Sequence, residues 1–558
     1  MRSARSAGRG LLAAAALLVI FAAAACTKVG TEPAAGPGAA RHPWTHPGLL
    51  RLASAADPKS LDPVLASAQP TLELSFFIFS YSVRYDDRAL PHPDALRELP
   101  TVANGDVSRD GLTLRYKLRP NMKWHDGRPV TSKDLWFTWK VVMNPANNDV
   151  TQDGYRDIAS IDYSNPLVAV IHMKKVYAPF LQQLFAPNGN APILPEHILA
   201  KYNDAKGSFN TAPFQSAPIG SGPFQFVAWD RGQAVRLKAF DDFYLGKPKL
   251  REVVYRILPD QNTMLTQMKT HEVDLVFNAS AGQYEQYRSI PGVTTIAPAL
   301  YVYDHLDFNL RRPLFQDVRM RRALTYALDR KAILDKVQHG LGDLADADES
   351  PVIGHAYDPH VMHYGYDPVK ARALLDELGW HAGPGGIRVR AGARLSFTLS
   401  TQTESTHGQA VQALVQRYWR DVGVEAVVKN FPTSLFFDNT ANGTLQGGHY
   451  DTALFAWSGA ADPDDSAIYS GHNMAPRGQN ALFWQDARAT AAMDDALSTV
   501  DDMRRKRDYF IVQEQLASEL PTVVLYFRRE PLAYNDDLKN FTASPVISVF
   551  WNTWEYSI

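Results

Sequence analysis

Residues 110–142 combine two different hydrophobic periods within one short stretch of chain. Apolar and polar residues alternate strictly over residues 112–119, which predicts a half-buried strand. A turn rich in Asp, Gly and Pro follows at residues 124–129. Thr131 then caps a predicted helix, whose apolar residues recur at helical spacing until residues 144–145 (Asn-Pro) end it. A strand followed so closely by a helix restricts this region to folds that pack helices against sheets.

The same mixture continues along the chain. Residues 224–237 predict a β-hairpin that turns at residues 230–232 (Asp-Arg-Gly). Helices are predicted from Asp317 to Leu328 and from the capping residue Asp367 to residue 379. Because strands and helices intermix throughout, the sequence favours the α/β fold class.

The N-terminal segment has the features of an export signal. Three arginines and no acid occupy residues 1–10, an apolar run fills residues 11–25, and Cys26 follows as the only cysteine of the 558 residues. We therefore predict a signal peptide at residues 1–25. The apolar run of about fifteen residues is short of the roughly twenty that a spanning helix needs, and no later run approaches that length, so we predict no permanent transmembrane helix.

Cys26 can be interpreted in several ways. Residues 24–26 (Ala-Ala-Cys) are similar to the end of a bacterial lipobox, in which the cysteine is lipidated and becomes the N-terminus, although Ala23 stands where that motif prefers leucine. The alternatives are an ordinary signal with a chance cysteine, a buried structural cysteine and a reactive thiol. We favour the lipid anchor, because a thiol beside a flexible segment has no walls that would desolvate a substrate.

Residues 26–47 are rich in Gly, Pro and Ala, which predicts a flexible tether. The chain after Cys26 contains no thiol, so we expect no disulfide there. Without the signal, 54 basic residues remain against 59 acidic ones, a net charge of −5. This balance, without basic blocks, argues against nucleic acid as a partner. The roughly 510 residues after the tether exceed what one core comfortably supports, so we expect two or three domains.

Six segments resemble the family 5 extracellular solute-binding proteins, the dipeptide-, oligopeptide- and nickel-binding receptors of ABC importers. They occur in the order that the family has and span nearly the whole chain after the tether. The segments are residues 57–63 (DPKSLDP), 110–135 (DGLTLRYKLRPNMKWHDGRPVTSKDL), 219–233 (IGSGPFQFVAWDRGQ), 315–333 (FQDVRMRRALTYALDRKAI), 366–380 (YDPVKARALLDELGW) and 515–530 (QLASELPTVVLYFRRE).

The resemblance implies an α/β, two-lobed periplasmic-binding-protein fold of type II, similar to cluster C, with an extra subdomain in lobe I. It assigns residues 48–305 and 526–558 to lobe I, residues 75–215 approximately to the extra subdomain, and residues 306–525 to lobe II. The hinge strands would lie near residues 307–309 and 523–526. The lobes of such a protein close around their ligand.

The resemblance also implies a function. The protein would be a monomeric receptor that is not an enzyme and needs no cofactor or metal. It would be held by the lipid on Cys26 in the periplasm or at the outer face of the cytoplasmic membrane. It would capture an extended peptide or another small polar solute and deliver it to the membrane permease subunits of an ABC importer.

The expected ligand site centres on residues 455–465. In peptide-binding relatives, an aspartate shortly after a tryptophan at the end of a lobe II strand pairs with the α-ammonium of the ligand. Here Trp457 matches, but Ala460 occupies the usual position of the aspartate. Either Asp462 takes over this role, or the ligand has no free amine there, since a desolvated ammonium binds poorly without a carboxylate. We predict Trp457, Ser458, Gly459 and Asp462 as ligand contacts, with an ordinary core position as the alternative for Trp457.

Three further residues are predicted as ligand contacts. Arg477 would bind a ligand carboxylate bidentately, with a surface arginine as the alternative. Tyr81 lies where lobe I of the family lines the cleft, although core packing explains it equally well. Ser221 would offer donors between two glycines, although a tight structural turn explains that position too.

Other ligands and other functions are the remaining alternatives. Because of Ala460, a receptor of the same fold for an oligosaccharide, an opine, nickel or haem stays open. A secreted hydrolase of peptides or glycans would need paired carboxylates or a nucleophile in the cleft, and the sequence offers no such set. Motifs for nucleophilic serine, phosphate loops, zinc proteases and dinucleotides are absent, and we interpret His125 as part of a structural turn.

Overall fold

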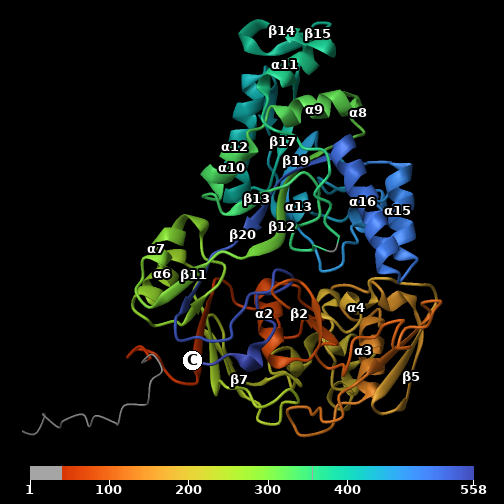
Figure 1. The fold of residues 1–558 in the computed structure, drawn as a ribbon, viewed down its shortest axis with the longest axis vertical. Coiled ribbons are helices and arrows are strands. Elements are labelled where there is room, and N and C mark those ends of the chain that lie inside the picture. The colour runs from red at the N-terminus through yellow and green to blue at the C-terminus, as the bar shows by residue number, and fades with distance from the viewer. Residues whose placement is uncertain (1–40, 355) are drawn as a thin grey trace, which may run out of the picture. The chain divides into compact units, whose positions relative to one another are not determined.

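Two large β-sheets organise the chain (Figure 1). The computed structural model describes residues 41–354 and 356–558, of which Trp44–Ile558 form one compact unit. The predicted signal peptide, Cys26 and most of the predicted tether lie outside the described residues. Among the helices of the described part, none has both the length and the apolar character to cross a membrane.

The first sheet contains both the first and the last strand of the described chain. Its strands are β1 (Leu49–Ser54), β7 (Phe224–Asp230), β8 (Ala234–Ala239), β9 (Glu252–Ile257), β10 (Leu275–Val276), β11 (Val293–Ile296) and β21 (Leu532–Asn535), in the order β11-β21-β10-β1-β9-β8-β7. β1 runs parallel to β9 and β10, whereas β7, β8 and β9 pair antiparallel. β21 lies antiparallel between β10 and β11, so the end of the chain completes the interior of this sheet.

The second sheet has six strands. They are β12 (Ala299–Phe308), β13 (Gly342–Leu344), β17 (Ser396–Ser400), β18 (Glu425–Val428), β19 (Thr452–Ser458) and β20 (Thr522–Arg529), in the order β13-β20-β12-β19-β17-β18. β12 lies antiparallel between β19 and β20, and β17 runs parallel to β18 and β19.

The chain passes between the two sheets twice. It leaves the first sheet after β11 and enters the second at β12, and it returns between β20 and β21. The two crossings are residues 297–298 and 530–531, each of which includes a proline. β12 and β20 pair along most of their length, so the two connections lie side by side. The lobe boundaries and the hinge remain predictions.

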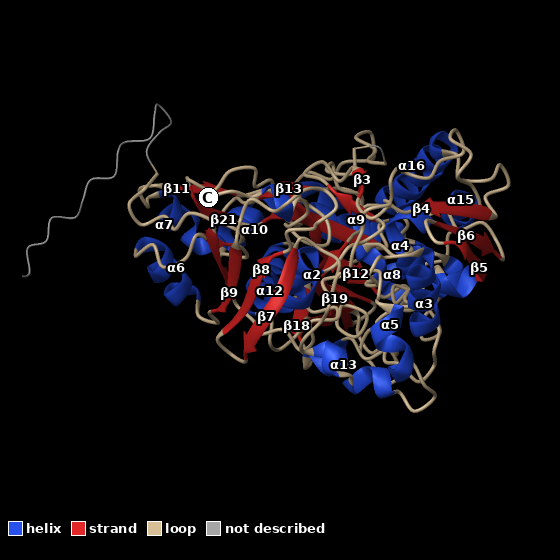
Figure 2. Ribbon diagram, turned by 90° about the horizontal axis from the view of Figure 1, so that it is seen from below, coloured by secondary structure: helices blue, strands red, loops and turns tan. Residues whose placement is uncertain are grey.

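A third sheet contains the strand and the helix that residues 110–142 predict. β4 (Thr113–Lys117), β5 (Ile158–Asn165) and β6 (Val168–Met173) pair in the order β4-β6-β5, and α3 (Ser132–Val142) contacts β5 and β6. The predicted strand and helix are confirmed, and Thr131 and Asp134 form a capping box at the start of α3. This sheet lies at the far end of the molecule from β11 and β21 (Figure 2).

The remaining elements of the described residues are five short strands and the helices. The strands are β2 (Val83–Tyr85), β3 (Pro91–Pro93), β14 (His381–Ala382), β15 (Arg388–Arg390) and β16 (Ala393–Arg394). The helices are α2 (Gln69–Ile78), α4 (Phe180–Gln183), α5 (Glu196–Leu199), α6 (Gln261–Lys269), α7 (Tyr284–Arg288), α8 (Pro313–Gln316), α9 (Val318–Tyr326), α10 (Arg330–Val337), α11 (Pro368–Glu377), α12 (Thr406–Asp421), α13 (Thr433–Phe436), α14 (Ser466–Tyr469), α15 (Ala487–Leu497) and α16 (Asp502–Glu519).

The other local predictions are confirmed as well. The hairpin predicted around residues 230–232 is β7 and β8. The side chains of Asp317 and Asp367 accept hydrogen bonds from the first turns of α9 and α11, as expected of N-caps. Gly379 follows α11 with a φ of 79°, a backbone conformation that favours glycine at the end of a helix.

Each large sheet has its own hydrophobic core. The larger core covers the first sheet and reaches Tyr301, Tyr303 and Phe527 at the start of β12 and the end of β20. A second core packs α9, α10 and α12 on the six-stranded sheet. The strands that connect the sheets are therefore buried where they leave the first core, which keeps the adjoining site on rigid elements.

Candidate functional site

A cavity of about 600 Å³ lies beside the strands that connect the two sheets. One side is lined by residues of α2, by residues 187–190 and by residues 544–549, and the other by β12, α12 and the end of β19. Ligand-binding cavities in proteins commonly measure about 300–1,000 Å³. We call this cavity the cleft.

One basic side chain of the cleft is already neutralised. Arg528 of β20 donates to both carboxylate oxygens of Asp304 in β12, at 2.7 and 2.8 Å. His407 of α12 lies 3.3 Å from the same carboxylate. Burial alone would raise the pKa of Asp304, but these hydrogen bonds and charges hold it well below its usual value. Arg528 therefore has little free charge with which to bind a ligand anion.

Glu530 differs, because it lines the cleft and has no hydrogen bond or ion pair within the described part of the chain. It is the only acid among the described residues that line the cleft. Burial raises the pKa of Glu530, and the charges of Arg528 and His407 oppose that effect. Burial also raises the pKa of Glu73, which accepts a hydrogen bond from Asn278 of the cleft, to about 8. Glu530 is thus the carboxylate that is best placed to meet a cation in the cleft.

Two of the predicted contact residues line the cleft. Ser458 is exposed at the end of β19, and Gly459 follows it. A Cβ atom at position 459 would lie only 2.3 Å from the ring of Tyr301, so only glycine allows the chain to lie flat against that ring. The tyrosine is itself held from behind, because its hydroxyl donates to Glu349 at 2.8 Å.

Trp457 lines a separate pocket of about 130 Å³ on the six-stranded sheet. We call it the aromatic pocket, because Phe437, Phe455, Trp457 and Tyr469 form much of its wall. His305 and Gln446 line it as well. Trp457 lines this pocket, whereas Ser458 and Gly459 line the cleft, so the end of β19 contributes to both cavities, which share no lining residue.

The structure places the other predicted contact residues outside both cavities. Asp462 forms an ion pair with Arg505 of α16, at 2.6 Å, and therefore already has a cationic partner. Tyr81 is fully buried, with its hydroxyl 2.6 Å from that of Ser75. Arg477 is exposed on a loop. None of the three lines the cleft or the aromatic pocket among the described residues.

Ser221 is also outside both cavities, in a structural turn. The flanking residues Gly220 and Gly222 lie so close to the backbone of Ile78 that added Cβ atoms would collide with it. His125 bonds this turn through both ring nitrogens, with Nδ1 accepting from Gly220 N at 3.2 Å and Nε2 lying 3.0 Å from the oxygen of Gly222. Burial lowers the pKa of His125 to about 4, so the ring is neutral at pH 7 and fits the structural interpretation.

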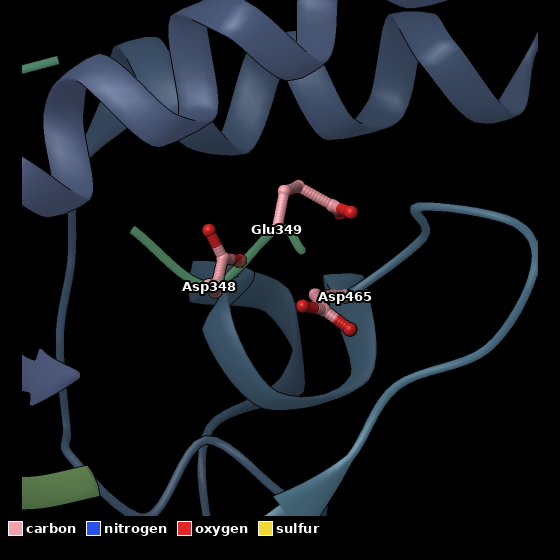
Figure 3. A group of neighbouring side chains, drawn as sticks. All are labelled: Asp348, Glu349 and Asp465. Carbon is pink, nitrogen blue, oxygen red and sulfur yellow. The ribbon is translucent and has the colours of Figure 1, made fainter. Parts of the chain in front are cut away.

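Two buried acids and one half-buried acid form a cluster behind Tyr301 (Figure 3). Asp348, Glu349 and Asp465 each have an oxygen within 4.8 Å of the others, and such oxygens are the ligands that hard cations prefer. Burial raises the pKa of Asp348 to about 6 and those of Glu349 and Asp465 well above the usual value. The repulsion between these neighbouring carboxylates is therefore relieved by bound protons, and a bound cation would relieve it in the same way.

Glu530 and Tyr301 were not among the residues that the sequence predicted for the site. Glu530 is the last residue of one of the six segments that carry the family resemblance, and this position was the only indication in the sequence that it could belong to the site. The sequence does not reveal that Arg528, two residues earlier, is occupied by Asp304 of another strand, while Glu530 has no partner among the residues that the structure describes.

The model of the bacterial extracellular solute-binding proteins, family 5, matches residues 95–476. The oligopeptide-binding protein AppA of Bacillus subtilis is 26% identical over 509 residues, which cover 89% of each chain. A putative ABC transporter peptide-binding protein of Brucella ovis is 28% identical over 473 residues, which cover 84% of this chain and 86% of that protein. The similarity therefore extends over nearly the full length of these relatives.

Solved structures agree in fold. The structure of AppA from Bacillus subtilis in complex with a nonapeptide superposes with a TM-score of 0.74 at 24% identity, covering 92% of this chain and 99% of that one. NikZ from Campylobacter jejuni in complex with Ni(L-His) gives a TM-score of 0.75 at 25% identity, covering 92% and 100%. These matches confirm the predicted α/β fold of the type II periplasmic-binding proteins.

Proposed function

Because the chain belongs to the bacterial extracellular solute-binding proteins of family 5, we propose that it captures peptides in the cleft and delivers them to the permease of an ABC importer. The observation that carries this proposal is the cleft itself, which is lined by strands of the six-stranded sheet on one side and by α2 and residues 544–549 on the other, beside the two crossings of the chain. Closure of two lobes about these crossings would enclose the ligand, and the permease would recognise the closed form.

The lining of the cleft supports an elongated ligand with a cationic end. We propose that Glu530 pairs with the α-ammonium of the peptide. It would replace the aspartate that peptide-binding relatives carry at the position of Ala460. Ser458 and Gly459 would contact the main chain, and Trp457 would contact a side chain in the aromatic pocket. Asp462 is less suited to this role than Glu530, because Arg505 neutralises it.

The ligand class can be tested by thermal unfolding of the protein with peptides, oligosaccharides, opines, nickel or haem. We expect saturable stabilisation by short peptides, of about 2.7 kcal/mol at one hundred times Kd. Mass spectrometry of the recovered peptide should show it unchanged, as expected of a receptor. Steady hydrolysis of the peptide would contradict the proposal in favour of a hydrolase, and stabilisation by a sugar alone would contradict the ligand class.

We further propose that the protein is exported and held by a lipid on Cys26, as a monomer at the outer face of the cytoplasmic membrane or in the periplasm. The basic head, the short apolar run and the small residues before Cys26 support this proposal. Cells fed a labelled fatty acid should incorporate label into the wild type and into a Thr27→Ala control, but not into Cys26→Ala. Equal labelling of all three proteins would contradict the anchor.

A further inference from the structure

Two residues that line the aromatic pocket each have a buried polar atom with no partner within the described part of the chain. These atoms are Nε2 of His305, a residue that is 3% exposed, and Oε1 of Gln446, which is 8% exposed. Both residues line the pocket. A buried polar atom without a partner is costly, so such a pair in one small pocket indicates a ligand that bonds to it.

The tautomer of the neutral His305 ring follows from its second nitrogen. Nδ1 lies 2.8 Å from Oδ1 of Asp307, which is buried beside it on β12. An ionised carboxylate can only accept a hydrogen bond, so Nδ1 carries the proton and, in the neutral ring, Nε2 is an acceptor. Thr522 of β20 lies 3.2 Å from the same Nδ1 and helps to fix the ring.

The pocket therefore presents acceptors to its ligand. Nε2 of His305 and the amide oxygen of Gln446 both need a donor, namely an O–H or N–H group. The remaining surface is largely apolar and aromatic. Phe455 packs edge-on against His305 with ring centroids 4.2 Å apart, and Phe437 packs against Phe455 at 5.6 Å. A flat ring inserted here would continue these edge-to-face contacts.

The volume sets the size of that ring. An apolar cavity of about 150 Å³ in another protein holds one benzene, and the aromatic pocket measures about 130 Å³. It therefore fits a single six-membered ring better than the double ring of an indole. Its mouth is open to solvent, because Asn439 and Gln479 of its lining are exposed and Phe437 is 40% exposed.

We propose that the aromatic pocket is a specificity site for a phenol group, such as the side chain of a tyrosine in the bound peptide, with its hydroxyl donating to His305 or Gln446. The identity of the molecule that carries the ring rests on the proposed function, whereas the preference for a phenol rests on the pocket alone. Trp457 lines the pocket, and the next two residues of the chain, Ser458 and Gly459, line the cleft.

Two pairs of probes test the pocket by isothermal titration. The first pair is p-cresol and toluene, and the second is Ala-Tyr-Ala and Ala-Phe-Ala, each pair differing by one hydroxyl. We expect the hydroxylated member to bind the wild-type protein at least about tenfold more tightly, because its absence leaves the pocket acceptors unpaired. His305→Phe keeps a ring and removes the acceptor, so the two members of each pair should then bind with about equal affinity.

A second variant and a control keep the test independent of any folding defect in His305→Phe. Gln446→Met preserves shape and removes the other acceptor, and it should reduce the preference for the hydroxyl severalfold. Gln286→Met makes the same change on the exposed surface of α7 and should leave the preference intact.

The outcomes separate the two proposals. If both peptides bind equally, or if p-cresol binds no better than toluene, the phenol site is overturned while peptide capture stands. If neither peptide binds but p-cresol does, in a manner that depends on His305, peptide capture fails and the phenol site stands. If neither p-cresol nor Ala-Tyr-Ala binds, the phenol site is overturned.

Discussion

Replacing Glu530 with glutamine is expected to weaken the binding of a peptide with a free N-terminal amine by about 30-fold or more. Removing one partner of a desolvated charge pair costs about 2–5 kcal/mol, because the other charge stays in the cleft without a counter-ion. Arg528 cannot compensate, since it is basic and already bound to Asp304. Isothermal titration of Glu530→Gln with Ala-Tyr-Ala measures the effect.

An acetylated peptide provides the matched ligand. Acetylation removes the ammonium, so acetyl-Ala-Tyr-Ala should bind the wild type and Glu530→Gln with similar affinity. The control variant is Glu377→Gln, which makes the same change on the exposed face of α11 and should leave both affinities unaltered. A loss in Glu530→Gln that is equally large for both peptides would show that Glu530 supports the fold of the cleft and does not bind the amine.

The pH dependence of the same titration gives a second readout. Burial raises the pKa of Glu530 above its usual value, and the pairing needs the ionised form. As the pH falls through this raised pKa, a proton replaces the ammonium, so the affinity of the wild type should fall towards that of Glu530→Gln. The variant itself should show no such dependence on this group.

Replacing Arg84 with methionine is expected to reduce the free energy of unfolding by about 3–5 kcal/mol, the usual cost of breaking a buried ion pair. Arg84 and Asp94 have side chains that are each 1% exposed, and they lie 2.8 Å apart. Arg84 also donates to the carbonyl oxygens of Phe76, Phe79 and Trp551. The substitution removes a buried donor from each of these acceptors, although Asp94 keeps the Tyr244 hydroxyl and Phe76 O keeps the Thr553 hydroxyl.

Urea denaturation of Arg84→Met measures this loss. The control is Arg97→Met, which breaks an exposed pair with Glu98 and should change the free energy of unfolding by no more than about 1 kcal/mol. The double variant Arg84→Met/Asp94→Leu also takes the acceptor from the buried N–H of Tyr81 and hydroxyl of Tyr244, so it should be no more stable than Arg84→Met. Unaltered stability of Arg84→Met would show that water satisfies the carbonyl groups in its absence.

The elements that sequence reasoning predicted correctly are those that local rules determine. The start of α3 follows from Thr131 and Asp134, three residues apart, and the β7–β8 hairpin follows from one turn. Similarly, Ser458 and Gly459, which were predicted as contacts because they directly follow a recognisable tryptophan, line the cleft, and their contact with a ligand stays a prediction.

The charge pattern of the cleft was not predictable in this way, because it depends on pairs that are remote in sequence. Asp462 is neutralised by Arg505, 43 residues later, and Arg528 by Asp304, 224 residues earlier. Each pairing requires knowledge of which elements lie side by side. A carboxylate that the sequence suggested for the ligand therefore proved to be occupied, while Glu530, which the sequence did not single out, has no partner in residues 41–354 and 356–558.

The interior position of β21 governs when the first sheet can form during synthesis. β10 and β11 leave the ribosome early, but the strand that lies between them follows only near the end of translation. At about 5–20 residues per second, the delay is on the order of 10–50 s. During that time the nascent chain cannot complete the sheet and keeps two strand edges unpaired. The topology itself thus delays the completion of this sheet until translation is almost complete.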